Sequence, residues 1–191
     1  MDRAGRYIDR LHPDGTLEPV LLCPRETSPA HWDWDERQIV QLQTDSRLWC
    51  TWRSKAGIYQ STYDGETWSA PSLWSGIAPQ AVSKHWMARS PSGRLVCVLN
   101  NSASRTNMIV ALSEDDGATW PVGMRAVLRP DTSAYPVGDF TADGRIVVAY
   151  DVSRQPPWSS IRGSVVDEEA LASGNTTTSF ENFNISLYEE P

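Results

Sequence analysis

The residues best suited to ligand chemistry in this chain are one glutamate, two arginines and one tyrosine, in the order Glu36, Arg53, Arg105 and Tyr135. An arginine guanidinium is planar and always charged, and it can hold a carboxylate through two parallel hydrogen bonds. Two arginines brought together by the fold would therefore suit an anionic ligand. Each residue alone also has an ordinary structural explanation, as a strand aromatic, a solvated carboxylate or a surface arginine. Whether they form a site depends on the elements that carry them.

Three segments of the sequence share one pattern, in which a turn is followed by an apolar strand that begins with arginine. β-Prone runs precede and follow each strand, so each unit can supply three or four antiparallel strands. Four-stranded units that repeat at about 40 to 50 residues are typical of β-propeller blades. The repeat strands are 47–53, 94–100 and 145–151, with preceding runs at 37–43, 85–89 and 135–140 and following runs at 57–63, 106–113 and 160–166.

The same position near the end of the three repeat strands holds Arg53, Asn100 and Asp151. If these strands lie on the inside of the blades, the three side chains would converge near the propeller axis. This repeat position therefore gives some support to a functional role for Arg53.

Two turns in the sequence resemble each other closely. The first runs from Ser61 to Trp68 and the second from Ser113 to Trp120, and the second matches the pattern Ser-x-Asp-x-Gly-x-Thr-Trp at every defining position. This pattern is the Asp box of sialidases and related β-propellers. Tyr63 stands where the first copy should have aspartate. Both boxes are expected to be structural turns without chemistry, in which Gly117 supplies a positive φ and the final tryptophan is largely buried.

The repeats predict an all-β, partial β-propeller with about three to four blades of four-stranded antiparallel sheet, and the resemblance of the Asp boxes implies that this β-propeller is sialidase-like. Residues 1–30 form an N-terminal segment in which a hairpin at Asp14-Gly15 is consistent with an outer half-blade. Residues 31–191 contain the blades, a short helical turn at 167–171 and a further strand near 180–188. Because closed propellers use about four to eight blades, we expect a homo-oligomer or a part of a larger propeller.

Composition excludes several classes of function. The formal charge of −7 argues against nucleic-acid binding and against anionic membranes. No apolar run is long enough to span a membrane, and the segment after Met1 contains no signal peptide, so the location stays unknown and is cytoplasmic by default. The pair Asp33 and Asp35 lacks the further ligands of a metal loop and is interpreted as a solvated turn. We expect no metal and no cofactor.

Three cysteines, Cys23, Cys50 and Cys97, are an odd number, which argues against a disulfide framework. Cys50 and Cys97 fall at equivalent repeat positions, and the third repeat has Val148 there. We therefore expect both to be small buried hydrophobic residues.

The order Glu36, Arg53, Arg105 and Tyr135, together with the Asp boxes, resembles the C-terminal part of an exo-α-sialidase (neuraminidase). Sialidases are the glycosidases that use a tyrosine nucleophile. The resemblance implies that Tyr135 is this nucleophile and that Glu36 is the carboxylate that removes its proton. It also implies that Arg53 and Arg105 are two of the three arginines that hold the substrate carboxylate.

The chain also departs from this family. Sialidases take their first arginine and their aspartate acid/base from N-terminal blades, and residues 1–30 match neither motif. Two functions therefore stay open. One is a sialidase-like glycoside hydrolase, or a fragment of one, that acts on or binds sialic-acid-type or other glycans. The alternative is a non-catalytic β-propeller module for glycan or protein binding or for self-assembly.

Overall fold

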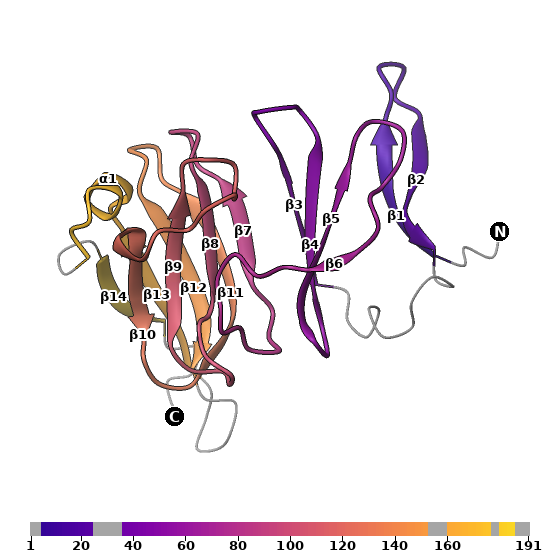
Figure 1. The fold of residues 1–191 in the computed structure, drawn as a ribbon. Coiled ribbons are helices and arrows are strands. Elements are labelled where there is room, and N and C mark those ends of the chain that lie inside the picture. The colour runs from indigo at the N-terminus through magenta and orange to yellow at the C-terminus, as the bar shows by residue number, and fades with distance from the viewer. Residues whose placement is uncertain (1–4, 25–35, 153–159, 177–179, 186–191) are drawn as a thin grey trace, which may run out of the picture.

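A computed structural model describes residues 5–24, 36–152, 160–176 and 180–185. These residues form a two-stranded hairpin and three four-stranded antiparallel sheets, here called blades 1, 2 and 3 (Figure 1). The hairpin is β1 (Gly5–Leu11) and β2 (Leu17–Pro24). Blade 1 is β3 (Arg37–Gln41), β4 (Leu48–Ser54), β5 (Gly57–Tyr63) and β6 (Ser72–Leu73). Blade 2 is β7 (Trp86–Arg89), β8 (Leu95–Asn100), β9 (Met108–Ser113) and β10 (Arg125–Arg129). Blade 3 is β11 (Ser133–Phe140), β12 (Ile146–Val152), β13 (Ser160–Val166) and β14 (Phe180–Ile185).

Helical structure is short in the described residues. It consists of the 3-10 helix η3 (Val122–Met124) and the helix α1 (Glu168–Ala172), which begins at the N-cap Asp167. The all-β fold of a partial β-propeller, the hairpin at Asp14-Gly15 and the helical turn after β13 are therefore confirmed. No helix among the described residues is long and apolar enough to cross a membrane.

Strands within each blade pair in chain order, with the first strand at one edge. The first strands gather on one side of the molecule, since β3 contacts β7 and β11 contacts both β7 and β8. The predicted repeat strands are β4, β8 and β12, so they are the second strands of their blades and not the innermost ones.

The blades pack face to face through two apolar clusters. Leu95, Cys97 and Leu99 of β8 face blade 1, where Trp49 and Trp74 lie in the same cluster. Val96 and Val98 face the other way and pack with Ile146, Val148 and Tyr150 of blade 3. Every residue of β8 is therefore buried, whereas burial alternates along β12 between buried and half-buried residues. Blade 2 is covered on both faces, whereas among the described residues another blade covers only one face of blade 3.

Cys50 and Cys97 are free and completely buried, as the repeats predict. Burial raises the pKa of the Cys50 thiol to about 12 and also raises that of Cys97. Val148 is equally buried. Cys23 has no described side-chain environment.

The turn at 113–120 is held by its own side chains. Asp115 accepts a hydrogen bond from the Ser113 hydroxyl at 2.8 Å and from the Thr119 amide at 2.8 Å. The Thr119 hydroxyl donates to the same carboxylate at 2.6 Å, and Gly117 has a φ of 84°. The Trp120 side chain is 4% exposed and its indole N–H donates to the Gly117 carbonyl at 3.1 Å. The expected burial of Trp120 is confirmed.

The turn at 61–68 is also held by a carboxylate, but the carboxylate comes from a different position of the motif. Asp64, one residue later than the motif requires, accepts from the amides of Glu66 and Thr67 at 2.9 and 2.8 Å. Tyr63 is buried and stacks on Trp68, with the ring centroids 5.1 Å apart. Trp68 is partly buried, less completely than Trp120, and it packs against the small cluster of Cys50 and Trp52.

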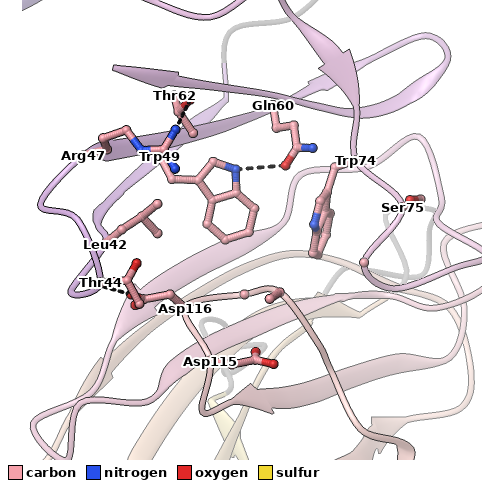
Figure 2. A pocket seen from close by; sticks show the side chains of 13 residues that line it. Leu42, Thr44, Arg47, Trp49, Gln60, Thr62, Trp74, Ser75, Asp115 and Asp116 are labelled. Carbon is pink, nitrogen blue, oxygen red and sulfur yellow. Dashed lines mark hydrogen bonds between the residues drawn. The ribbon is translucent and has the colours of Figure 1, made fainter. Parts of the chain in front are cut away.

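The carboxylate of Asp116 connects blade 2 to blade 1 at one side of the pocket that Figure 2 shows. Asp116 has a φ of 57° and accepts from the amides of Gln43 and Thr44 at 2.8 and 2.7 Å. These amides lie in the turn between β3 and β4 of blade 1. Arg89 pairs with the same carboxylate. The pocket has a volume of about 450 Å³ and is lined on its other side by Trp49 and Trp74.

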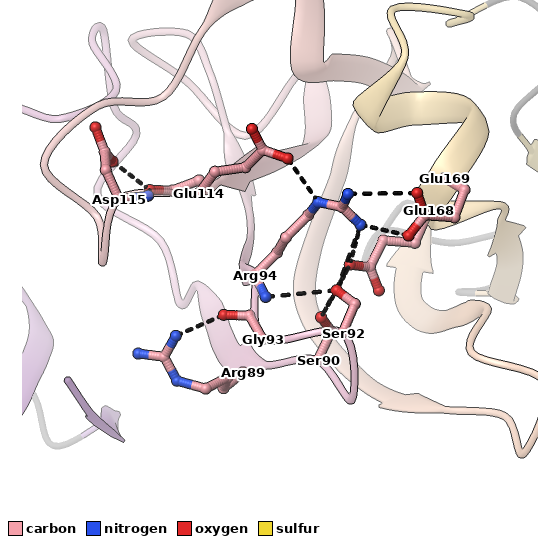
Figure 3. Close-up of polar contacts among 10 residues, drawn as sticks. Arg89, Ser90, Ser92, Gly93, Arg94, Glu114, Asp115, Glu168 and Glu169 are labelled. Carbon is pink, nitrogen blue, oxygen red and sulfur yellow. Dashed lines mark hydrogen bonds and ion pairs between the residues drawn. The ribbon is translucent and has the colours of Figure 1, made fainter. Parts of the chain in front are cut away.

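A second carboxylate joins blade 3 to blade 2 in the equivalent way (Figure 3). Glu168 of α1 is buried and accepts from the Ser90 hydroxyl at 2.9 Å and from Ser92. Arg94 pairs with Glu168 at 3.2 Å and with Glu169 at 2.6 Å. These contacts reach the turn between β7 and β8. Blades 2 and 3 therefore each place an acid on the corresponding turn of the blade before them.

Candidate functional site

Tyr135 lies at an irregularity near the start of β11. Ala134 pairs with Asp151 and Val137 pairs with Ala149, so Tyr135 and Pro136 together face the single residue Tyr150. Such a bulge redirects a side chain out of the regular alternation of a strand. Tyr135 also has a φ of 55°, although a residue before proline normally prefers extended backbone. Backbone strain of this kind is often found at functional sites.

Arg53 connects two of the predicted site residues. It lies on β4, and its side chain is almost completely buried. Its Nε lies 2.8 Å from a carboxylate oxygen of Glu36, which directly precedes β3. Its Nη1 donates to the Tyr135 hydroxyl at 3.4 Å, and its Cζ lies 5.6 Å from the centroid of the phenol ring. Glu36, Arg53 and Tyr135 thus form one contiguous polar group that links blade 1 to blade 3.

Arg105 reaches the same phenol from blade 2. It lies in the loop between β8 and β9, and its Cζ is 5.3 Å from the Tyr135 ring centroid. Its backbone carbonyl accepts from the Ser133 amide at 2.9 Å, which joins the loop to the beginning of β11. The fold therefore gathers two guanidinium groups around one tyrosine. A cation over an aromatic face is favourable, which offsets part of the repulsion between the two arginines.

Charges around Tyr135 make its phenol more acidic. Burial acts to raise the pKa of Tyr135, but the hydrogen bond and the positive charge of Arg53 lower it, and Arg105 lowers it further. Glu36 opposes this effect because a second negative charge near the phenolate is unfavourable. The net result is a pKa below the ordinary value of a phenol. This direction favours proton loss from Tyr135.

Two residues at this site were not predicted from the sequence. Lys84 is half-buried, and its Nζ donates to the Pro136 carbonyl at 2.7 Å. His85 is completely buried, and its Nε2 shares a hydrogen bond of 2.7 Å with the Thr51 hydroxyl of β4. Both residues lie in the connection before β7, outside the repeated strands. An isolated Lys-His pair next to an apolar strand was the only available signal.

The residues equivalent to Arg53 in the other repeats also approach β11. The Asn100 amide donates to the Ser133 carbonyl at 3.1 Å and to the Thr106 carbonyl at 3.2 Å. Asp151 lies close enough to Lys84 to favour its charged form. Arg53 and Asn100 thus both reach β11, at Tyr135 and at Ser133, although their strands are not the innermost ones.

The geometry suits an anionic ligand better than a metal ion. Among the described residues, no three histidine, cysteine, aspartate or glutamate side chains are placed to hold a metal. Asp33 and Asp35 lie outside the described residues. The two guanidinium groups instead offer hydrogen-bond donors to a carboxylate. The phenol beside them, whose pKa is lowered, offers a nucleophile to the ligand atom that bears this carboxylate.

Comparison with known proteins gives a sequence family and a fold. The family model described as BNR repeat-like domain matches residues 25–152. The search of curated proteins found no match.

Three solved structures share the fold. A protein of unknown function from Dyadobacter fermentans is 16% identical with a TM-score of 0.58, over 96% of this chain and 52% of its own. A GH43 β-1,3-galactosidase is 13% identical with a TM-score of 0.61, over 95% of this chain and 40% of its own. The intramolecular trans-sialidase from Ruminococcus gnavus, in complex with oseltamivir carboxylate, is 18% identical with a TM-score of 0.53, over 88% of this chain and 35% of its own. The chain thus spans about half or less of the length of these structures.

Proposed function

Because the chain belongs to the BNR repeat-like domain family, we propose that its blades carry part of a sialidase-like glycoside hydrolase site. The proposed ligand is a sialic-acid-type sugar, which bears a carboxylate on its anomeric carbon. The observation that carries the proposal is the placement of Arg53 and Arg105 around the phenol of Tyr135. Arg53 is paired with Glu36, whereas Arg105 has no ion pair among the described residues, and a protein without use for an anion would normally pair both arginines or separate them.

In this proposal Arg53 and Arg105 bind the ligand carboxylate, Tyr135 attacks the anomeric carbon and Glu36 accepts the phenolic proton. A neutral tyrosine suits this attack because a carboxylate nucleophile would be repelled by the carboxylate of the sugar. The lowered pKa of Tyr135 supports its part, since less free energy is needed to deprotonate it. The Arg53–Glu36 ion pair holds the guanidinium in place beside the hydroxyl.

Binding and turnover are separable in this site. The leaving group of a glycoside needs a proton donor, and residues 1–30 match no acid/base motif of the sialidases. We therefore expect the chain to bind N-acetylneuraminic acid or its dehydrated 2,3-ene analogue weakly, with slow or undetectable hydrolysis. The alternative of a non-catalytic glycan-binding module predicts the same binding with no turnover at all.

Isothermal titration calorimetry with the 2,3-ene analogue tests the proposal. Arg105→Ala should weaken binding at least about tenfold, because a hydrogen bond to a charged group is worth about 1.5–3 kcal/mol. Binding to the unmodified chain should also weaken as salt is added, since the attraction is between charges. Arg47→Ala is the matched control, because it removes one arginine from the opposite end of β4, where Arg47 pairs with Asp45.

Equal affinity of the Arg105→Ala and Arg47→Ala variants would refute the carboxylate site. Release of a fluorescent aglycone from a sialoside, abolished by Tyr135→Phe, would support the hydrolase over the binding module. Rapid hydrolysis that survives Tyr135→Phe would instead show that the nucleophile lies elsewhere.

A further inference from the structure

We propose that Lys84 and His85 form a bridge between blades 1 and 3 that positions Tyr135 against Arg53. The bridge rests on the proposed function only for its biological meaning, because the position of the phenol can be measured without any ligand. The two residues are adjacent in the segment before β7, and Lys84 is bonded to blade 3 whereas His85 is bonded to blade 1.

The first arm of the bridge holds the strained part of β11. Lys84 Nζ donates at 2.7 Å to the carbonyl of Pro136, the residue directly after Tyr135. This carbonyl lies inside the bulge, where regular pairing with β12 is interrupted between Ala134 and Val137. A charged donor to a backbone carbonyl is among the stronger hydrogen bonds in proteins. Lys84 therefore stabilises the conformation that turns Tyr135 toward Arg53.

The second arm of the bridge holds the strand that carries Arg53. His85 Nε2 lies 2.7 Å from the hydroxyl of Thr51, which is two residues before Arg53 on β4 and is itself buried. Burial lowers the pKa of His85 to about 3, and the nearby charge of Lys84 acts in the same direction. His85 is therefore neutral at ordinary pH, and this arm does not respond to mild acid.

The contact that the bridge controls is sensitive to small movements. The Arg53 Nη1 to Tyr135 hydroxyl distance is 3.4 Å, which is near the outer limit of a hydrogen bond. A shift of β11 away from β4 by a fraction of an ångström would break it. The phenol would then lose the hydrogen bond that most strongly favours its ionised form.

Four charged groups lie around the Tyr135 phenol, each from a different element of the fold. Arg53 comes from β4, Arg105 from the β8–β9 loop, Glu36 from the segment before β3 and Lys84 from the segment before β7. Asp151 of β12 acts on Lys84, as does Glu36. Removal of Lys84 could raise the phenol pKa through lost charge as well as lost position, so a neutral substitution in the other arm is also needed.

Nuclear magnetic resonance of the chain labelled with ¹³Cζ-tyrosine tests the bridge. The Tyr135 signal is identified by its loss in Tyr135→Phe, and its titration gives the phenol pKa in each variant. Lys84→Met and Thr51→Val should both raise this pKa toward the ordinary value of a phenol, whereas Lys84→Arg should restore most of the original value. Lys55→Met, which removes the other lysine of the chain, is the matched control and should leave the titration unchanged.

An unchanged Tyr135 titration in both Lys84→Met and Thr51→Val would overturn the bridge. A rise in Lys84→Met alone would also overturn it, because charge without positioning would then explain the effect. Thr51→Val keeps the side-chain shape and the net charge, so it remains informative if Lys84→Met fails to fold. If the titration shifts as expected but the unmodified chain does not bind the 2,3-ene analogue, the bridge stands and the proposed function fails.

Discussion

Asp116 occupies a position at which the Asp-box pattern allows any residue, yet its carboxylate joins two blades. Burial acts to raise the pKa of Asp116, but hydrogen bonds from Thr44 and Arg89 lower it below its usual range. The folded state therefore binds the proton more weakly than the unfolded chain does. The carboxylate stabilises the fold above the unfolded-state pKa of about 4, and this stability is lost as the pH falls through and below that value.

Asp116→Asn should therefore lower the free energy of unfolding at pH 7 by about 1–3 kcal/mol, since the two amides and Arg89 lose a charged acceptor. The difference from the unmodified protein should shrink below pH 4. Urea unfolding followed by tryptophan fluorescence across this pH range measures both effects. Asp143→Asn, which changes an exposed acid paired with Arg145, is the control and should have little effect. Parallel curves for Asp116→Asn and the unmodified protein at every pH would contradict the expectation.

The residues around Tyr135 show what a sequence can and cannot predict at this scale. Glu36, Arg53 and Arg105 were recognisable because their order resembles that of sialidases. Lys84 was not, since it lies in a connection that does not repeat and its partner is a backbone carbonyl in another blade. A lysine whose partner is a backbone carbonyl requires no particular side chain in the other blade. The sequence therefore contains no pattern that would reveal its role.

The two similar turns differ in how completely their final tryptophan is buried. Trp120→Ala should destabilise the protein by about 3–5 kcal/mol, because it leaves a cavity between blades 1 and 2. Trp68→Ala should cost clearly less, because Trp68 is half-buried and packs in a smaller cluster. Thermal unfolding of the two variants gives this comparison directly, and equal losses would show that burial does not decide the role of these tryptophans.

Tyr63 offers a sharper test, because the motif itself suggests a substitution there. Tyr63→Asp would restore the pattern, yet we expect it to destabilise the protein. Asp64 already accepts the hydrogen bonds from the Glu66 and Thr67 amides, so a second carboxylate would be buried without donors. The stacking of Tyr63 on Trp68 would also be lost. A higher melting temperature in differential scanning calorimetry would refute this reasoning.

Most strands could be predicted from the sequence because each repeat combines a turn with an alternating or continuous apolar run. β4, β8 and β12 all follow a turn that ends in a positive φ, at Ser46, Gly93 and Gly144. Their place within the blade was not predictable, since pairing order depends on contacts between strands. The lesser burial of Trp68 than of Trp120 was not predictable for the same kind of reason, because a motif describes the turn and not what packs against it.

For the whole molecule, no other blade covers the face of blade 3 that points away from blade 2, in the part of the chain that the structure describes. Val137 is 53% exposed, and its cross-strand partner Ala149 lies on the face of β12 opposite the buried Val148 and Tyr150. Val147 and Val165 extend this apolar face. Such a surface favours association, and we expect the isolated chain to form a dimer through it.

Light scattering over a range of concentrations measures this association. Ala149→Glu should shift the equilibrium toward monomer, because it places a charge in the centre of the face. Val122→Glu is the control, since Val122 is 78% exposed in η3 and belongs to blade 2. A monomer at every concentration of the unmodified protein would count against the expectation.

The contrast between β8 and β12 also implies an order of amide hydrogen exchange. The amides of β8 lie in a strand whose two faces both pack on neighbouring blades, so opening this strand exposes apolar surface on both sides. Opening β12 costs less, because blade 2 covers it on a single face. Deuterium should therefore replace the amide protons of β12 before those of β8, and the amides of blade 2 should exchange last. Exchange would thus map the stacking of the blades as a gradient in time, from the open face inward.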